Sequence, residues 1–214
     1  MVERAKILEA VKTAIEKAPK RKFSESIDIT INLKNIDMAQ PKNRIDETVL
    51  LPNGTGENTG ICVIGKGDIV TQAKEAKVDL IIGPEEVERL GGAPREARRV
   101  ASTYKYFLAE TAVMPQVGRY LGPRLGPRGR MPMPIAGQTD IRPIVERLRK
   151  SVKVRTKDKT VFSTKVGSTA MTPEQVSENI DAIVKRVESV LEQGHLNVRS
   201  IYVKTTMGPS VRLV

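Results

Sequence analysis

The two ends of the chain share one pattern of hydrophobic and polar positions. Apolar residues at helical spacing predict an amphipathic helix over residues 2–18. Apolar and polar residues alternate over residues 27–33, which predicts a strand with one face toward solvent. Near the other end, Thr172 and Pro173 predict the start of a second amphipathic helix, and a last alternating strand follows at 201–204. Both ends therefore predict helices packed on half-exposed strands.

The middle of the chain follows a different pattern. Continuously apolar runs occur at 61–64, 78–82 and 106–109, and short helical patterns lie between them. Fully apolar strands that alternate with helices are typical of a parallel sheet covered on both faces. The alternating pattern returns at about residue 153.

These two patterns predict an α/β protein with a discontinuous outer domain. The outer domain takes residues 1–66 and 153–214, and an α/β domain is inserted as residues 67–152. Two strands would then connect the domains, and such a layout permits a hinge.

The charge of the chain indicates a polyanionic partner. Its 214 residues include 36 Lys and Arg against 25 Asp and Glu, a net charge of +11. A chain this basic most often binds nucleic acid, and a membrane surface or an acidic protein is the alternative. Aromatic residues make up only 3%, without tryptophan, so extensive base stacking is disfavoured. Recognition should then depend on shape, phosphates and sugars.

Other compositional features argue against an enzyme, a metal site or a cofactor. Cys62 is the only cysteine and lies in an apolar run, so it is expected to be a small buried hydrophobe. His195 is the only histidine, which leaves zinc binding and histidine-based catalysis poorly supported. The chain has neither an apolar stretch of about 20 residues nor an apolar signal core, so no membrane contact and a cytoplasmic location are expected.

A nucleotide-dependent enzyme is one alternative. The glycines between Gly54 and Gly60 resemble a dinucleotide loop, but the last spacing is one residue too long, and the stretch precedes a strand where such loops follow one. The phosphate-loop pattern is absent. A polar turn is the better interpretation.

The stretch from Gly118 to Pro132 combines glycines, prolines and arginines without any acidic residue. Because prolines remove backbone donors and restrict the residue before them, the stretch predicts an exposed loop. Guanidinium groups on such a loop suit phosphate oxygens, although a solvated basic loop between two helices is the alternative. The loop arginines are Arg119, Arg124, Arg128 and Arg130.

Two shorter blocks are candidates for closer contacts. The block Thr205 to Ser210 ends a strand with small hydroxyl residues, a methionine and a Gly-Pro turn. Small residues let a nucleic-acid backbone approach, and threonine hydroxyls can bond the ribose 2′-hydroxyl that distinguishes RNA from DNA. The block Lys22 to Glu25 contains Phe23, which would serve either as a core residue or as a surface contact. An ordinary turn remains the alternative for the first block.

These three blocks resemble the family of universal large-subunit ribosomal protein number one, the protein of the mobile stalk beside the tRNA exit site, in its archaeal form. The block Thr205 to Ser210 is highly specific to that family, and the resemblance covers essentially the whole chain. It implies a split β-α-β outer domain of α+β type and a Rossmann-like inserted domain with three α/β layers.

The resemblance also implies a function without catalysis. The protein would belong to the large ribosomal subunit in the cytoplasm and would be a monomer when free. It would bind the rRNA stalk, assist release of exit-site tRNA, and repress translation of its own mRNA through a similar RNA structure. The implied rRNA site comprises Lys22, Phe23, Ser26, Thr206, Met207 and Gly208, with Pro209 shaping the turn and with Lys165 and Gly167 nearby. The segment from Arg119 to Arg130 would be a second, weaker RNA contact.

A basic DNA-binding or chromatin protein is the main alternative. Such a protein would bind duplex DNA tightly. It would also be indifferent to Thr206→Val, because DNA has no 2′-hydroxyl for Thr206 to bond.

Overall fold

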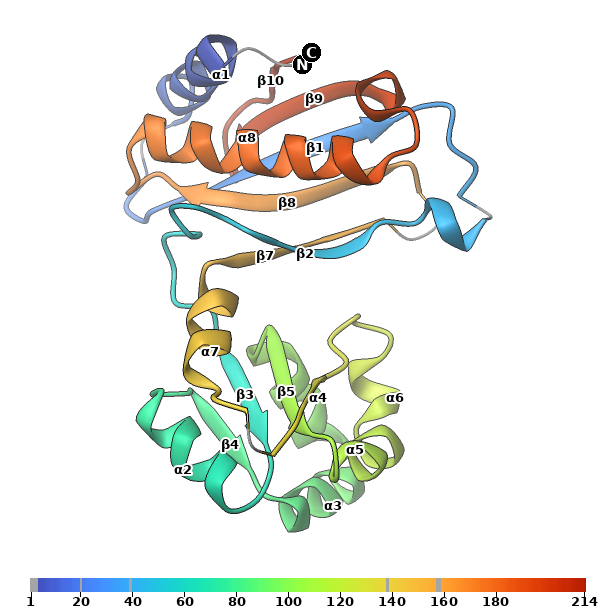
Figure 1. Ribbon diagram of the computed structural model, residues 1–214. Helices are drawn as coiled ribbons and strands as arrows, with labels where there is room; N and C mark the ends of the chain where they lie inside the picture. The colour runs from blue at the N-terminus through green and yellow to red at the C-terminus, as the bar shows by residue number, and fades with distance from the viewer. Residues whose placement is uncertain (1–3, 20, 39, 138, 157–158) are drawn as a thin grey trace. The chain divides into compact units, whose positions relative to one another are not determined.

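The chain folds into two compact units. The computed structural model describes residues 4–19, 21–38, 40–137, 139–156 and 159–214. The outer unit comprises residues 1–57 and 150–214, and the inserted unit comprises residues 58–149 (Figure 1). The limits at 57/58 and 149/150 differ from those expected at 66/67 and 152/153. The strand at 61–64 pairs with two strands of the inserted unit, which explains the first difference.

The outer unit is built on a four-stranded antiparallel sheet with helices α1 and α8 on one face (Figure 1). The sheet order is β10-β9-β1-β8, so β1 lies between two strands that helix α8 connects. This is a split β-α-β arrangement. The elements are α1 (Arg4–Glu16), β1 (Ser26–Leu33), a 3₁₀ turn (Pro41–Asn43), β2 (Asp46–Leu50), β7 (Ser151–Arg155), β8 (Val161–Ser168), α8 (Pro173–Val190), a second 3₁₀ turn (Gly194–Asn197), β9 (Val198–Thr205) and β10 (Val211–Arg212).

The side chains of β1 alternate between buried and half-buried positions, as predicted. Ile27, Ile29 and Ile31 are fully buried beneath the helices, whereas the residues between them are half-buried on the other face. A register shift between Ile27 and Asp28 marks a bulge at the first end of the strand. The sheet therefore has one helix-covered face and one polar face.

Helix α8 begins at the predicted residues. The Thr172 side chain accepts a hydrogen bond from the Gln175 amide, and the Gln175 side chain accepts one from the Thr172 amide, which forms a capping box. Pro173 occupies the first helical turn, where its missing donor has no cost.

Asn179 fixes α8 to the strands around it from a fully buried position. Its Nδ2 donates to the carbonyl oxygens of Gly54 (2.7 Å) and Val166 (2.8 Å), and its Oδ1 accepts from the Asn53 amide (3.1 Å). One side chain thereby satisfies polar backbone groups of two other segments.

Strands β2 and β7 form a separate two-stranded antiparallel ribbon in the outer unit. The Asp46 carboxylate pairs with Lys153 Nζ (2.9 Å) and Arg155 Nε (3.2 Å) across the ribbon. The pairing continues beyond the strands, because the Leu51 amide donates to the Lys150 carbonyl (3.0 Å). The chain therefore leaves and re-enters the outer unit at adjacent points.

The inserted unit is a three-layer α/β unit with a parallel sheet in the order β4-β3-β5-β6. One apolar cluster packs α3 to α6 on one face, and a second packs α2 and α7 on the other. The α/β fold class is thus confirmed. The elements are β3 (Ile61–Ile64), α2 (Asp68–Glu75), β4 (Leu80–Ile82), α3 (Pro84–Gly92), α4 (Pro94–Thr103), β5 (Tyr106–Glu110), α5 (Met114–Tyr120), α6 (Gly122–Leu125), β6 (Met133–Ile135) and α7 (Arg142–Arg149).

The prediction of one exposed loop over residues 118–132 is wrong for its first half. Residues 118–120 close α5, and α6 follows directly. Pro123 lies in the first turn of α6, where a proline is tolerated, and Leu121 and Leu125 are buried beneath the helices. The apolar spacing of these two leucines outweighs the glycines and prolines around them.

Candidate nucleic-acid interface

The structure brings the Lys22 block and the Thr206 block together at one end of the outer sheet. The Thr206 amide and hydroxyl both donate to the Ser26 carbonyl, at 3.0 and 3.2 Å. These segments lie 180 residues apart in sequence. We call this region the strand-end surface; it comprises Lys22, Phe23, Ser26, Thr206, Met207 and Gly208.

Glu25 is the buried residue that holds the strand-end surface in place. Its carboxylate accepts a hydrogen bond from the Met207 amide (3.2 Å), and only 4% of the residue is exposed. Its amide donates to Thr169 Oγ1 (3.0 Å), and its carbonyl accepts from the Thr169 amide (2.9 Å). Three chain segments therefore meet at Glu25. Sequence reasoning missed this role, although an acid inside a basic binding block is a signal that could have revealed it.

Two large apolar side chains project from the strand-end surface. Phe23 is 58% exposed and Met207 is 53% exposed. The alternative of a core phenylalanine is therefore excluded. Lys22, Thr206 and Pro209 are also exposed, and Ser26 is half-buried. The surface combines a cation, an exposed hydroxyl and two apolar contacts on a backbone fixed by hydrogen bonds.

Gly208 closes the turn tightly. Its amide donates to Thr205 Oγ1 (3.0 Å), and Thr205 is fully buried. A Cβ at position 208 would overlap that same hydroxyl and lie 3.2 Å from the Ala18 Cβ. Only glycine fits this turn without displacing Thr205.

Gly208→Ala is therefore expected to lower the free energy of unfolding by about 1–3 kcal/mol and to weaken RNA binding. Gly118→Ala is the control, because its Cβ would meet nothing within 4 Å in helix α5. That change should be neutral or stabilising by up to about 1 kcal/mol. Denaturant unfolding of both variants makes the comparison, and equal stability would contradict the tight turn.

Lys165 and Gly167 lie in the neighbouring strand β8 but play different parts. Lys165 Nζ pairs with Glu57 Oε2 at 2.5 Å, although the geometry of this ion pair is not that of a hydrogen bond. Gly167 is buried, and a Cβ there would lie 3.1 Å from Val176 Cγ2 in α8. The glycine therefore allows close packing of α8 on the sheet, while the lysine belongs to the polar face.

The polar face of the sheet carries further groups that the sequence reasoning did not single out. Asp28 lies opposite Lys165 on one side and Lys204 on the other. Burial raises the pKa of the Asp28 carboxyl, and the two lysines oppose that effect. Thr30 and Asn32 bond across the sheet to Ser163 and Ser200, each at 2.7 Å. The alternation of β1 was a signal that could have identified these positions.

The four arginines of the stretch from Gly118 to Pro132 do not share one loop. Arg119 ends α5, with its guanidinium 5.8 Å from the centre of the Tyr120 ring. Arg124 is half-buried on α6. Arg128 Nη1 donates to the Arg98 carbonyl (3.5 Å), so it lies beside α4.

Arg130 has a structural role at the end of α4. Its Nη1 donates to the carbonyls of Ala101 (2.6 Å), Ser102 (2.9 Å) and Tyr104 (2.9 Å). Burial, with Arg128 nearby, lowers the pKa of the Arg130 guanidinium. These bonds cap the helix and fasten the following segment to it.

The described residues offer little to catalysis or to metal binding. They contain no group of three or more His, Cys, Asp or Glu placed to hold a metal ion. Cys62 is buried, as predicted, and burial raises the pKa of its thiol, which disfavours the reactive thiolate. None of the helices in the described ranges is long and apolar enough to cross a bilayer.

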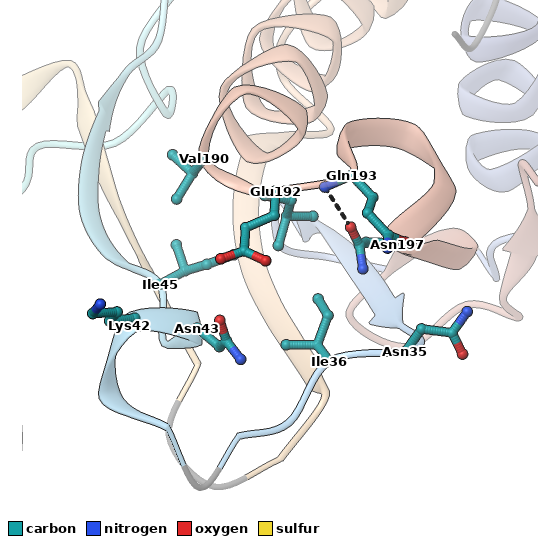
Figure 2. A pocket seen from close by; sticks show the side chains of 10 residues that line it. Asn35, Ile36, Lys42, Asn43, Ile45, Val190, Glu192, Gln193 and Asn197 are labelled. Atoms are coloured by element: carbon teal, nitrogen blue, oxygen red, sulfur yellow. Dashed lines mark hydrogen bonds between the residues drawn. The ribbon is translucent and has the colours of Figure 1, made fainter.

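Figure 2 shows a small pocket between the segment that follows β1 and the segment that joins α8 to β9. Its wall is rich in amides, with Asn35, Asn43, Gln193 and Asn197 among the lining residues. The Asn197 side chain accepts from the Gln193 amide (2.9 Å) and donates to the Lys34 carbonyl (3.2 Å). The polar atoms of the Asn197 side chain are therefore occupied by backbone groups of the protein itself. The residues that line the pocket do not include an acid, a base and a nucleophile together.

Comparison with known proteins agrees with this picture. Residues 12–209 match the Ribosomal protein L1p/L10e family. The chain is 93% identical to the large ribosomal subunit protein uL1 of Methanoregula boonei and 71% identical to that of Methanoculleus marisnigri, in each case over 100% of both chains. It is 45% identical to the uL1 protein of Archaeoglobus fulgidus, again over 100% of both.

These matches confirm the resemblance read from the three sequence blocks, including its archaeal form. They also confirm that the protein is not an enzyme. The chain belongs to the Ribosomal protein L1p/L10e family.

Proposed function

We propose that the chain is a structural constituent of the large ribosomal subunit and that its strand-end surface binds the stalk region of large-subunit rRNA. In that place it assists the release of tRNA from the exit site. It also represses translation of its own mRNA by binding a similar RNA structure. It acts in the cytoplasm as part of the ribosome and is a monomer when free.

Membership of a ribosomal protein family supports the first part, since rRNA binding is expected of the family. One structural observation supports the location of the site. Exposed Thr206 and Met207 stand on backbone fixed by the Ser26 carbonyl and by the buried Glu25 carboxylate, and exposed Phe23 lies two residues before Glu25. A surface already ordered before binding has less conformational entropy to lose.

Two features of the protein would contribute to RNA binding in different ways, its net charge and its strand-end surface. Salt-sensitive attraction to phosphates comes from the net charge of +11. Discrimination between sequences must come from close contacts of the strand-end surface, because phosphate contacts carry no sequence information. The same surface would serve rRNA and mRNA if both present the same local RNA shape.

The test measures binding of the full chain to a large-subunit rRNA stalk fragment, a scrambled RNA of equal length and a DNA duplex, at moderate and high salt. We expect a preference of at least about a hundredfold for the stalk fragment, retained at high salt because close contacts do not depend on counterion release. Equal binding to all three nucleic acids that disappears with salt would contradict the proposal. It would favour a basic DNA-binding protein instead.

A further inference from the structure

Helix α4 of the inserted unit carries a basic face that the sequence reasoning did not identify. Arg95, Arg98 and Arg99 are all exposed and lie on adjacent turns, at spacings of three and four residues. Ala97 and Ala101 are buried on the opposite side of the helix. The three guanidinium groups therefore leave the helix away from the core.

The positive charge of this face is not neutralised within the described part of the chain. Glu96 is the only acid in α4, and it faces Arg89, at 3.6 Å. Among the described residues, Arg95, Arg98 and Arg99 have no ion-pair partner. Like charges on neighbouring turns destabilise an isolated helix by a few tenths of a kcal/mol per pair, so the arrangement is not explained by helix stability.

The segment after α6 adds a further cation and holds it in place. The three bonds from Arg130 to the carbonyls at the end of α4 fasten residues 126–130 to the helix. Arg128 is thereby kept beside Arg98, whose carbonyl it contacts at 3.5 Å. We call the group of Arg95, Arg98, Arg99 and Arg128 the α4 face.

We propose that the α4 face binds the phosphate backbone of an RNA helix and is the principal RNA contact of the inserted unit. The inference rests on the proposed function, because it takes RNA as the partner. It centres the second contact on α4 and keeps Arg128 from the expected arginine segment, since Arg130 supports the helix and Arg119 lies over Tyr120 on α5.

The composition of the face favours RNA phosphates over an acidic protein. Protein interfaces are centred on buried apolar or aromatic anchors. None of the large apolar side chains exposed in the described residues lies on α4, and Met131, after Arg130, is the one nearest in sequence to Arg128. Guanidinium groups without such an anchor suit a regular array of phosphate oxygens, which they contact without reading the sequence.

The test compares two triple variants of the full chain that remove equal charge from opposite faces of the inserted sheet. One carries Arg95→Gln, Arg98→Gln and Arg99→Gln. The control carries Lys66→Gln, Lys74→Gln and Lys77→Gln, around helix α2, which packs on the other face of the sheet. Affinity for the stalk fragment and for a scrambled RNA duplex is measured across a range of KCl concentrations.

For both RNAs we expect the α4 variant to flatten the slope of log K against log salt by about 2–3, because each lost phosphate contact lowers the slope by about 1. The control should change it by less than about 1. A variant with lysine at the three α4 positions keeps the charge and should retain the wild-type slope. It therefore distinguishes an effect of lost charge from an effect of altered folding. Preference for the stalk fragment should persist in every variant.

Equal slopes for the α4 variant and its control would overturn the inference. Loss of binding to polyglutamate by the α4 variant, with an unchanged RNA slope, would also overturn it, in favour of an acidic protein partner. These failures leave the proposed function untouched. That function fails only if the wild-type protein shows no preference for the stalk fragment.

Discussion

Replacing Thr206 with valine is expected to lower the affinity for the rRNA stalk fragment about 10- to 100-fold, with no change in the salt slope. The Thr206 hydroxyl gives its hydrogen to the Ser26 carbonyl, so its oxygen remains free to accept a bond from a ribose 2′-hydroxyl. Valine keeps the shape and removes that acceptor, at a cost of about 1–3 kcal/mol. Because the phosphate contacts remain, the salt dependence should not move.

The fold should tolerate the valine, since the Thr206 amide still donates to the same Ser26 carbonyl. Thr206→Ser is the matched control and should bind like the wild type. A stalk fragment with single 2′-deoxy substitutions completes a double-mutant cycle: the substitution that weakens the wild type should have no added effect on the valine variant. Fully additive effects at every sugar would show that Thr206 does not bond a 2′-hydroxyl.

Removing the Asn179 side chain is expected to give the largest loss of stability in the outer unit. Asn179→Ala leaves the carbonyls of Gly54 and Val166 and the amide of Asn53 without their partner. Since each unsatisfied buried group costs about 1–3 kcal/mol, the free energy of unfolding should fall by about 3–5 kcal/mol. Hydrogen exchange of the β1 amides measures this loss within the outer unit itself.

Two further variants separate the causes of that loss. Asn179→Asp keeps the size of the side chain but turns an oxygen toward two carbonyls, so it should destabilise at least as much as alanine. Asn53→Ala removes exposed hydrogen bonds to Gln175 and Glu178 on the same helix and should cost less than about 1 kcal/mol. If Asn179→Ala lowered the free energy of unfolding no more than Asn53→Ala, the role assigned to the buried Asn179 hydrogen bonds would be contradicted.

The helices and strands with strong hydrophobic periodicity could be predicted from the sequence. The exposed side chains of the sequence motifs could be predicted as well. The alternation in β1 and the apolar run of β3 reflect burial on one face and on two faces, which local patterns record directly. Phe23 and Met207 were placed on the surface by resemblance, and the structure exposes both.

The remaining features depend on pairs of residues far apart in the chain. Glu25 meets Thr169, and Asn179 meets Gly54, through contacts that no local pattern records. Helix α4 could not be predicted from its apolar pattern, because its buried positions, Ala97 and Ala101, are small residues that give only a weak apolar stripe. Strand β6 is short and contains Pro134, which is tolerated because the strand lies at the edge of the sheet.

The position of β1 between β8 and β9 also affects the synthesis of the protein. The inserted unit is a continuous segment that can fold while translation continues, whereas β1 has to wait for partners more than a hundred residues later. The strand-end surface forms only when Thr206 pairs with Ser26, which precedes it by 180 residues. A nascent chain that has not yet been extended past Met207 therefore lacks the proposed RNA site.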